Sequence, residues 1–104
     1  MIISSIEYVP GKEIESLGHV IGSTVMSKHI GRDIAAALKS VVGGEIKGYT
    51  EMLREAQSLV VKRIQEEAAK LGADAIVGMH FTSISWQDGS TGLIAYGTAV
   101  KFLV

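Results

Sequence analysis

The chain has 104 residues, of which 10 are lysine or arginine, 11 are aspartate or glutamate and none is cysteine. The net charge of −1, without a long run of either sign, argues against nucleic acid or an anionic membrane as a partner. The absence of thiols excludes disulfides, thiolate nucleophiles and thiolate metal sites. No apolar run approaches the roughly 20 residues that span a bilayer, and no basic region precedes a long apolar core at the N-terminus. These features predict one soluble, cytoplasmic domain over residues 1–104.

The N-terminal quarter predicts two strands joined by a turn. Residues 2–8 are short and β-prone, and residues 9–12 (Val-Pro-Gly-Lys) have the sequence of a type II turn. Residues 14–27 are rich in β-branched side chains, which predicts a second strand. Its glycines, Gly18 and Gly22, fall on one side of that strand and indicate a bulge or a close backbone approach.

Two helices are predicted in the middle of the chain. Apolar residues at positions 30, 34, 38 and 41 form one narrow stripe, which predicts a short helix of about three turns before the glycine pair at 43–44. From Tyr49 to Leu71, apolar residues recur at three- and four-residue steps and predict a long amphipathic helix. Thr50 can cap its first turn, and Gly72 can take the left-handed conformation that ends it.

The chain after the long helix predicts an antiparallel hairpin. Two β-prone stretches, at residues 75–86 and 93–104, flank Asp88-Gly89, a dipeptide that is a strong hairpin signal. The predicted fold class is therefore α+β. We expect a largely antiparallel sheet of about four strands, with both helices between the second and third strands and the long helix across one face of the sheet.

The last strand has large apolar residues on both faces, yet one helical layer can cover only one of them. Exposing the other face would forfeit on the order of 5 to 10 kcal/mol, which is comparable to the whole stability of a typical domain. We therefore expect the subunits to associate. Trp86 can join this contact, because tryptophan is enriched at subunit contacts, or it can plug the edge of the core. The predicted contact residues are Trp86, Ile94, Tyr96, Val100 and Phe102.

Four blocks of sequence occur in order along nearly the whole chain: Val42-Gly43-Gly44 with Gly48-Tyr49, Leu53-Arg54-Glu55-Ala56, residues 71–78 (LGADAIVG) and Gly97-Thr98-Ala99-Val100. Together they resemble the YbjQ family of small uncharacterised bacterial and archaeal proteins. The resemblance implies an α+β subunit whose sheet joins others in a ring-shaped homo-oligomer, a pentamer, and it carries the family label of heavy-metal binding. Residues 80–82 (His-Phe-Thr) depart from the family pattern, in which acidic residues are common, so an acidic metal site at that strand is not implied here.

Three histidines are the only imidazoles available to a metal ion: His19, His29 and His80. First-row metals require two or three of them to converge, ideally with a carboxylate, and the spacing in sequence does not bring them together. His19 and His80 fall within predicted strands, where a hydrogen-bonded structural role is the simpler interpretation, and His29 falls at a helix entrance. No metal site or cofactor is predicted, although ring symmetry could gather copies of one histidine around an axis.

A second candidate site precedes the long helix. The segment with Gly43, Gly44, Gly48 and Tyr49 lies where free backbone N–H groups and the helix dipole can hold an anion. The Walker and dinucleotide glycine patterns are absent, and a helix stop followed by a turn explains the glycines equally well. A small ligand at this segment is thus a hypothesis.

No catalytic constellation is present. None of the serines lies in a Gly-x-Ser-x-Gly elbow, and Asp74, just after the helix stop, is expected to cap that turn. The sequence favours a non-enzymatic homo-oligomer that binds a small ligand or partner at a subunit interface or in a central channel. The alternatives are a metal-binding protein and, third, an enzyme whose site is shared between subunits.

Overall fold

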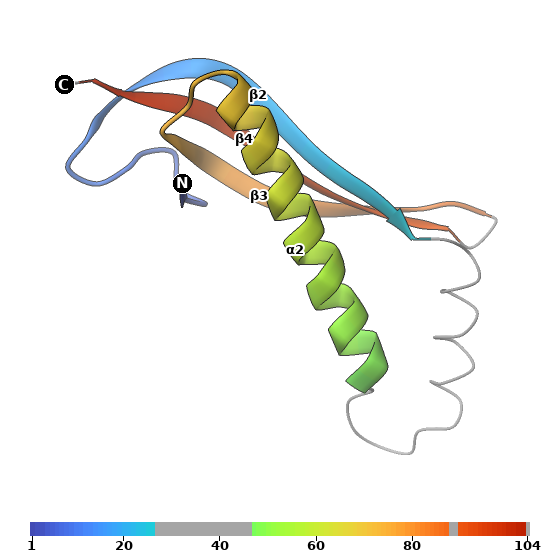
Figure 1. The fold of residues 1–104 in the computed structure, drawn as a ribbon. Coiled ribbons are helices and arrows are strands. Elements are labelled where there is room, and N and C mark those ends of the chain that lie inside the picture. The colour runs from blue at the N-terminus through green and yellow to red at the C-terminus, as the bar shows by residue number, and fades with distance from the viewer. Residues whose placement is uncertain (27–46, 88–89, 104) are drawn as a thin grey trace.

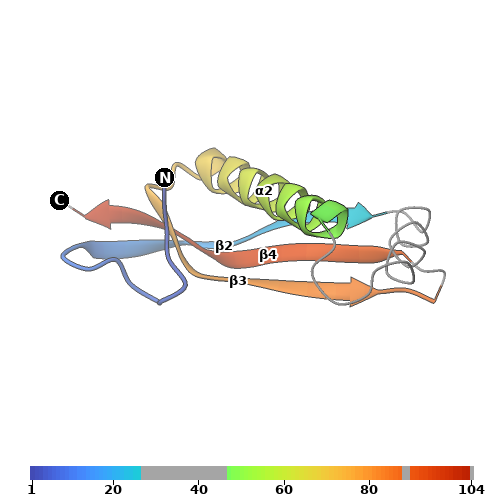
Figure 2. The ribbon, with the colours of Figure 1, turned by 90° about the horizontal axis from the view of Figure 1, so that it is seen from below.

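The computed structural model describes residues 1–26, 47–87 and 90–103. These residues form two layers, a sheet and one long helix that lies across one face of it (Figures 1 and 2). The elements in chain order are β1 (Ile2–Ile3), β2 (Glu13–Met26), α2 (Lys47–Lys70), β3 (Ala75–Ser85) and β4 (Thr91–Leu103). The predicted short helix near residues 30–41 and the Asp88-Gly89 tip of the hairpin lie outside the described residues.

The sheet has the strand order β1-β3-β4-β2 and is mixed. The pairs β3–β4 and β2–β4 are antiparallel, as predicted, but β1 runs parallel to β3. The prediction of a largely antiparallel sheet is therefore wrong at its first strand. The physical reason is that β1 and β2 lie at opposite edges of the sheet and point the same way, so residues 4–12 must cross the sheet between them instead of forming a hairpin.

Helix α2 forms because its apolar residues lie on one stripe, and that stripe is buried. Three residues of this stripe, Val60, Ile64 and Ala68, are fully buried. The helix begins at Lys47, ahead of the predicted start at Tyr49, so Thr50 lies inside the helix and is not its N-cap. Its C-terminus ends as predicted.

The end of α2 is a hydrogen-bonded stop built on Gly72. This residue has φ 77°, its N–H donates to the carbonyl of Ala69, and the N–H of Ala73 donates to the carbonyl of Ala68. This is the Schellman pattern, which satisfies the last helical carbonyls and requires a residue that tolerates positive φ.

The predicted roles of the two glycines in β2 are confirmed. Gly18 lies at a register shift opposite β4 and has φ 113°, which makes it a bulge. A side chain at Gly22 would collide with the backbone of α2 at Val60 and Ile64, so the helix rests directly on this strand. Arg63 of α2 also bonds to β2 at this contact: its Nη1 donates a hydrogen bond of 2.6 Å to the carbonyl of Ser23.

The start of β3 is joined to β4 through Asp74. Its N–H donates to the carbonyl of Val100 at 2.8 Å, and its Oδ2 accepts from the N–H of Phe102 at 2.8 Å. The expectation that Asp74 caps its own turn is therefore wrong, because the carboxylate bonds to the neighbouring strand. Asp74 thus extends the hydrogen bonding between β3 and β4 by one residue before the start of β3.

Each face of the sheet carries its own apolar cluster. The helix face buries Val20, Ile76, Ala95 and Ala99 against α2. The opposite face, which we call the outer face, holds a smaller cluster at one end. Its buried members are Val9, Ala75, Val77 and Val100. Val9 precedes Pro10-Gly11, where the N–H of Lys12 donates to the Val9 carbonyl and Gly11 has φ 76°, as the predicted type II turn requires. The N-terminal segment therefore covers part of the outer face.

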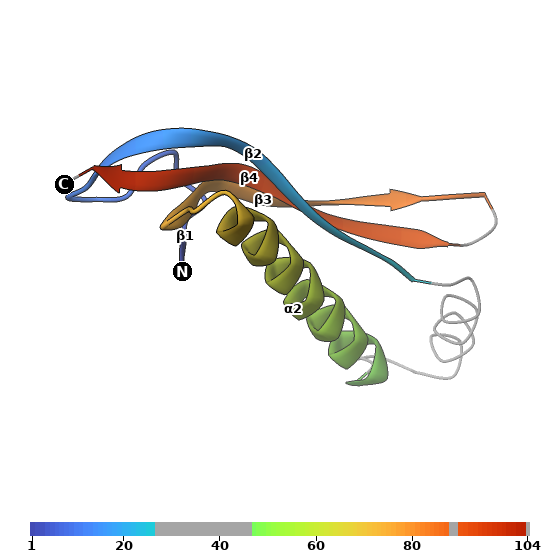
Figure 3. The ribbon, with the colours of Figure 1, turned by 45° about the horizontal axis from the view of Figure 1, so that its top comes forward.

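The two ends of the sheet differ in how well they are covered. Helix α2 leaves the sheet as it approaches the hairpin end of β3 and β4, which extends beyond it (Figure 3). We call this end the distal end. Phe81 and Trp86 lie there and are 42% and 47% exposed.

Gly22→Ala tests the contact between α2 and β2. We expect it to lower the free energy of unfolding by about 2 to 3 kcal/mol, because the added methyl group must push the helix backbone away from the strand. Urea denaturation at one fixed protein concentration measures the change. The matched control is Ser23→Ala at the adjacent, exposed position, which should change little. Equal stability of the two variants would contradict the close approach.

Candidate functional site

The outer face of the sheet can be read from the strand register. Across β4, the residues that share this face form rows: His19 and Val77 flank Thr98, and Ile21 and His80 flank Tyr96. In the described strands, no aspartate, glutamate, lysine or arginine occupies an outer-face position, whereas Glu13, Glu15 and Lys101 all point to the helix side. Such segregation of charge is typical of a surface that is covered or that binds.

Two bulges shape this face next to Thr98. One is at Gly18 in β2, and the other is at Gly78 in β3, where φ is 60° and the register with β4 shifts. Bulges bend and twist the strand that carries them. The outer face therefore curves at the level of Thr98, between the two shifts.

The N-terminal segment closes one side of the curved region. Ser4 exchanges hydrogen bonds with β3, donating to Ile76 and accepting from Met79, and the carbonyl of Ile6 accepts from the N–H of Gly78. These three bonds hold the next residue, Glu7, beside the bulge: a side chain at Gly78 would lie 4.0 Å from Cγ of Glu7. A loop residue is thus fixed over the sheet by backbone bonding.

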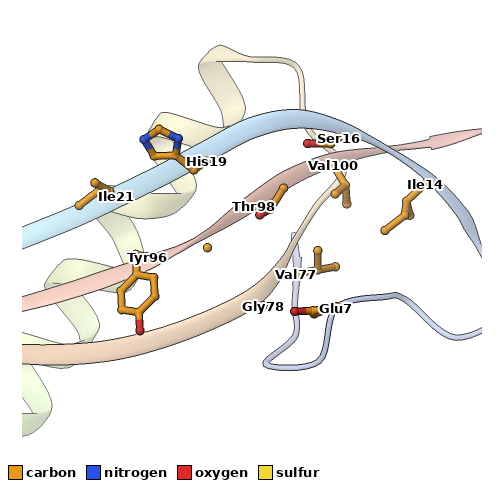
Figure 4. Close-up of a pocket in the computed structure, with 11 residues that line it drawn as sticks. Glu7, Ile14, Ser16, His19, Ile21, Val77, Gly78, Tyr96, Thr98 and Val100 are labelled. Atoms are coloured by element: carbon orange, nitrogen blue, oxygen red, sulfur yellow. The ribbon is translucent and has the colours of Figure 1, made fainter.

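Together these elements form an open groove of about 740 Å³ on the outer face. In Figure 4, Glu7 lies beside Gly78, His19 and Tyr96 lie at one end, and Ile14 lies at the other end. The lining residues are Glu7, Ile14, Ser16, His19, Ile21, Val77, Gly78, Tyr96, Gly97, Thr98 and Val100. An apolar floor with a few polar groups around it is the usual make-up of a small-molecule site.

From Ile21 and Tyr96 in the wall of the groove, an apolar and exposed surface continues to the distal end of the outer face. Ile21, Val25, Ile84, Trp86 and Tyr96 are between 44% and 64% exposed. The ring of Trp86 lies over Gly92, because a side chain on Gly92 would contact its Cη2 and Cζ3 atoms. Ile94 lies between the rows of these residues and is half-buried. We call this set the distal apolar patch: Ile21, Val25, Ile84, Trp86, Ile94 and Tyr96.

The predicted contact residues are divided between the covered and uncovered parts of the outer face. Trp86, Ile94 and Tyr96 belong to the distal apolar patch. Val100 is only 1% exposed within its own subunit, so the expectation that it is outward and uncovered is wrong. The cause is the N-terminal segment, whose Val9 packs in the same cluster. Phe102 is half-buried, with Nζ of Lys12 at 5.4 Å from its ring centroid.

The histidines do not form a metal site in the part of the chain that the structure describes. His19 and His80 share the outer face but lie on β2 and β3, on either side of β4 and two residues apart along it, so their backbones are about 12 Å apart. Both are exposed, which corrects the expectation of hydrogen-bonded structural histidines, and the ring of His80 lies 6.1 Å from that of Tyr96. No group of three or more potential ligands occurs among the described residues. His29 lies outside them.

The predicted anion segment is described only in part. Gly43 and Gly44 lie outside the described residues, while Gly48 and Tyr49 belong to the first turn of α2 and not to a turn before it. Anion binding there stays a prediction. Sequence reasoning missed the groove residues Glu7, Ser16 and Thr98. Glu7 lies on the N-terminal segment, whose path over the sheet no periodicity predicts. The bulge at Gly18 brings Ser16 to the same face as His19, the register neighbour of Thr98.

The sequence profile of one family, described as "Putative heavy-metal-binding", matches residues 1–103. The chain belongs to the YbjQ family. A UPF0145 protein of Vibrio campbellii is 57% identical over 104 residues, covering 99% of this chain and 100% of its own. A UPF0145 protein of Thermotoga maritima is 56% identical over 102 residues, covering 97% of this chain and 96% of its own. Neither of these YbjQ relatives carries an enzymatic name.

A solved structure supports the fold of this YbjQ chain. It is the crystal structure of a protein of unknown function from Pediococcus pentosaceus, assigned to the DUF74 family, with a TM-score of 0.62 and 14% sequence identity. The match covers 99% of this chain and 98% of that one. Among the described residues, α2 is not apolar enough to cross a bilayer.

His19→Ala and His80→Ala test whether the histidines have a structural or metal-dependent role. We expect each variant to melt within about 3 °C of the parent, because both side chains are exposed and no closed metal site contributes folding energy. Calorimetric melting with and without a chelator measures this. A chelator that unfolded the parent, together with loss of folding in His80→Ala, would show that a metal site holds the protein together.

Proposed function

We propose that this YbjQ protein is a non-enzymatic cytoplasmic subunit of a closed homo-oligomer, a pentameric ring, that holds a small ligand on the outer face of its sheet. The observation that carries the assembly is the distal apolar patch. Five of its six side chains are 44% to 64% exposed, and burying about half of each is worth on the order of 5 kcal/mol in total. A surface of this kind on a small domain favours association.

A second copy of the chain is the occupant that these observations favour. The outer-face positions of the described strands carry no charged side chain, so they offer no charge pattern by which a different protein could be recognised. The sheet also has two unequal free edges among the described residues: β2 along its length, and β3 beyond Met79, where β1 and the N-terminal bonds end. Edges of this kind pair readily with another chain.

The two free edges lie on opposite sides of the sheet, which favours a head-to-tail contact. Contacts between two different surfaces of identical subunits generate rings when the rotation closes. The resemblance to the YbjQ family implies a ring of five subunits. In such a ring the groove would open beside, or into, the space that the subunits enclose.

Metal binding is the second candidate function. It is favoured by one observation, that His19 and His80 are both exposed on the outer face, where symmetry would repeat each of them around an axis. Calorimetric titration of tag-free protein with Zn²⁺ separates the candidates. Binding at micromolar concentration with one ion per chain would favour the metal-binding function over the proposed one.

The ring is tested by light scattering coupled to gel filtration. The parent should elute with about five times the chain mass of 11.1 kDa. Ile84→Glu should give subunits of the single-chain mass, because a charge in the distal apolar patch must be desolvated in the contact.

The matched control is Ser58→Glu, which adds the same charge at an exposed position of α2 and should leave the mass unchanged. Val100→Glu is not a suitable variant, because Val100 is buried within its own subunit and the change would unfold it. A soluble parent of 11 kDa at micromolar concentration would refute the assembly.

A further inference from the structure

The groove on the outer face contains one charged side chain, Glu7. Its carboxylate makes no hydrogen bond or ion pair with any residue that the structure describes, although the residues before it are held by backbone bonds to β3. The nearest basic candidate, Lys12, does not line the groove, and its ammonium lies over the ring of Phe102. The carboxylate is thus placed beside the groove but is not neutralised.

The other lining groups fit an apolar body with one polar end. Val77, Val100 and Ile14 supply an aliphatic floor at one end. At the other end Tyr96 presents a ring that is 44% exposed beside His19, and Thr98, the register partner of Val77, adds a hydroxyl group between the two ends (Figure 4). The carboxylate of Glu7 attracts a cation by charge, and the ring of Tyr96 offers an apolar surface at the far end of the groove.

We infer that the groove binds a small organic cation, an amine that carries an apolar body. Its ammonium group bonds to the carboxylate of Glu7, and its apolar part lies along the floor of the groove, with Tyr96 closing one end. The inference rests on the proposed role of the outer face in holding a small ligand, and it names the chemical class of that ligand. The volume of about 740 Å³ lies in the range of sites for small molecules.

Other ligand classes fit the lining less well. An anion would meet the carboxylate of Glu7 and find no lysine or arginine among the lining residues. A metal ion would find one carboxylate and one imidazole, His19, which is short of the three protein ligands that even open zinc sites use. A purely apolar ligand would gain no bond from the carboxylate of Glu7.

Three probes of equal chain length test the ligand class: n-hexylamine, n-hexanol and n-hexanoate. Each is titrated into isotope-labelled protein, and the backbone amide shifts of Gly78, Gly97 and Thr98 report occupancy of the groove. We expect the amine to bind saturably and about three- to tenfold more tightly than the alcohol, and the carboxylate to bind most weakly, because the amine adds a charge-assisted bond to Glu7.

Glu7→Gln should reduce the affinity for hexylamine to that for hexanol. Glu7 is exposed and makes no bond to the described residues, so the variant is expected to fold. The matched control is Glu13→Gln, which removes the same charge from β2 at a position outside the groove and should leave the affinity unchanged. Equal binding of hexylamine and hexanol, tighter binding of hexanoate, or equal effects of the two variants would each overturn the inference.

Light scattering on the same samples separates this inference from the proposed ring. If the protein forms a ring but binds hexylamine and hexanol equally well, the inferred ligand class is wrong and the proposed assembly is supported. If the protein is a monomer and binds hexylamine through Glu7, the proposed ring is wrong and the inferred ligand class is supported.

Discussion

The close contact of α2 with the backbone of β2 at Gly22 is the constraint on which the rest of the structure depends. Because the helix rests on the strand itself, the residues between helix and sheet are mostly small or β-branched: Ala56, Val60, Ala68, Ala95 and Ala99. A helix fixed so closely at one point crosses the twisted sheet and leaves it toward the distal end (Figure 3). Among the described residues, the distal end of the β3–β4 hairpin consequently has no helical cover.

The outer face is covered differently from the helix face, by the N-terminal segment. Among the described residues, α2 covers the other face of the sheet, and the short N-terminal segment lies over part of the outer face. This segment crosses at the level of Val9 and Glu7 and seals the cluster around Val100, but it goes no further along the strands. The groove lies where this cover ends, and it shares Ile21 and Tyr96 with the distal apolar patch.

Periodicity in the sequence predicts most of the fold because the strongest signals are local. The three- and four-residue steps predict α2, and the alternation in β4 assigns Ala95 and Ala99 to the helix face and Tyr96 and Val100 to the outer face, as the register confirms. Gly72 and Gly22 also have the roles that their positions predict. Each of these features depends on residues that are neighbours within one helix or strand.

The features that the sequence does not predict depend on residues that are far apart in the chain. The direction of β1 is set by bonds between Ser4 and β3, and two residues carry no periodicity that could reveal it. The groove depends on bulges that reverse the alternation: Ile14 and His19 would lie on opposite faces of a regular strand, yet both line the groove. Glycine signals a bulge at position 18, but not which surface the bulge creates.

Assembly and ligand binding are physically coupled if the ring forms on this face. Covering the distal apolar patch would remove water from the neighbouring groove and lower the local dielectric around Glu7. A carboxylate that loses water without gaining a partner costs several kcal/mol, and a bound ammonium group offsets much of that cost. The same subunits would therefore favour a cation more strongly in the ring than alone. By linkage, a ligand that binds the assembled form more tightly also stabilises the assembly by the same free energy.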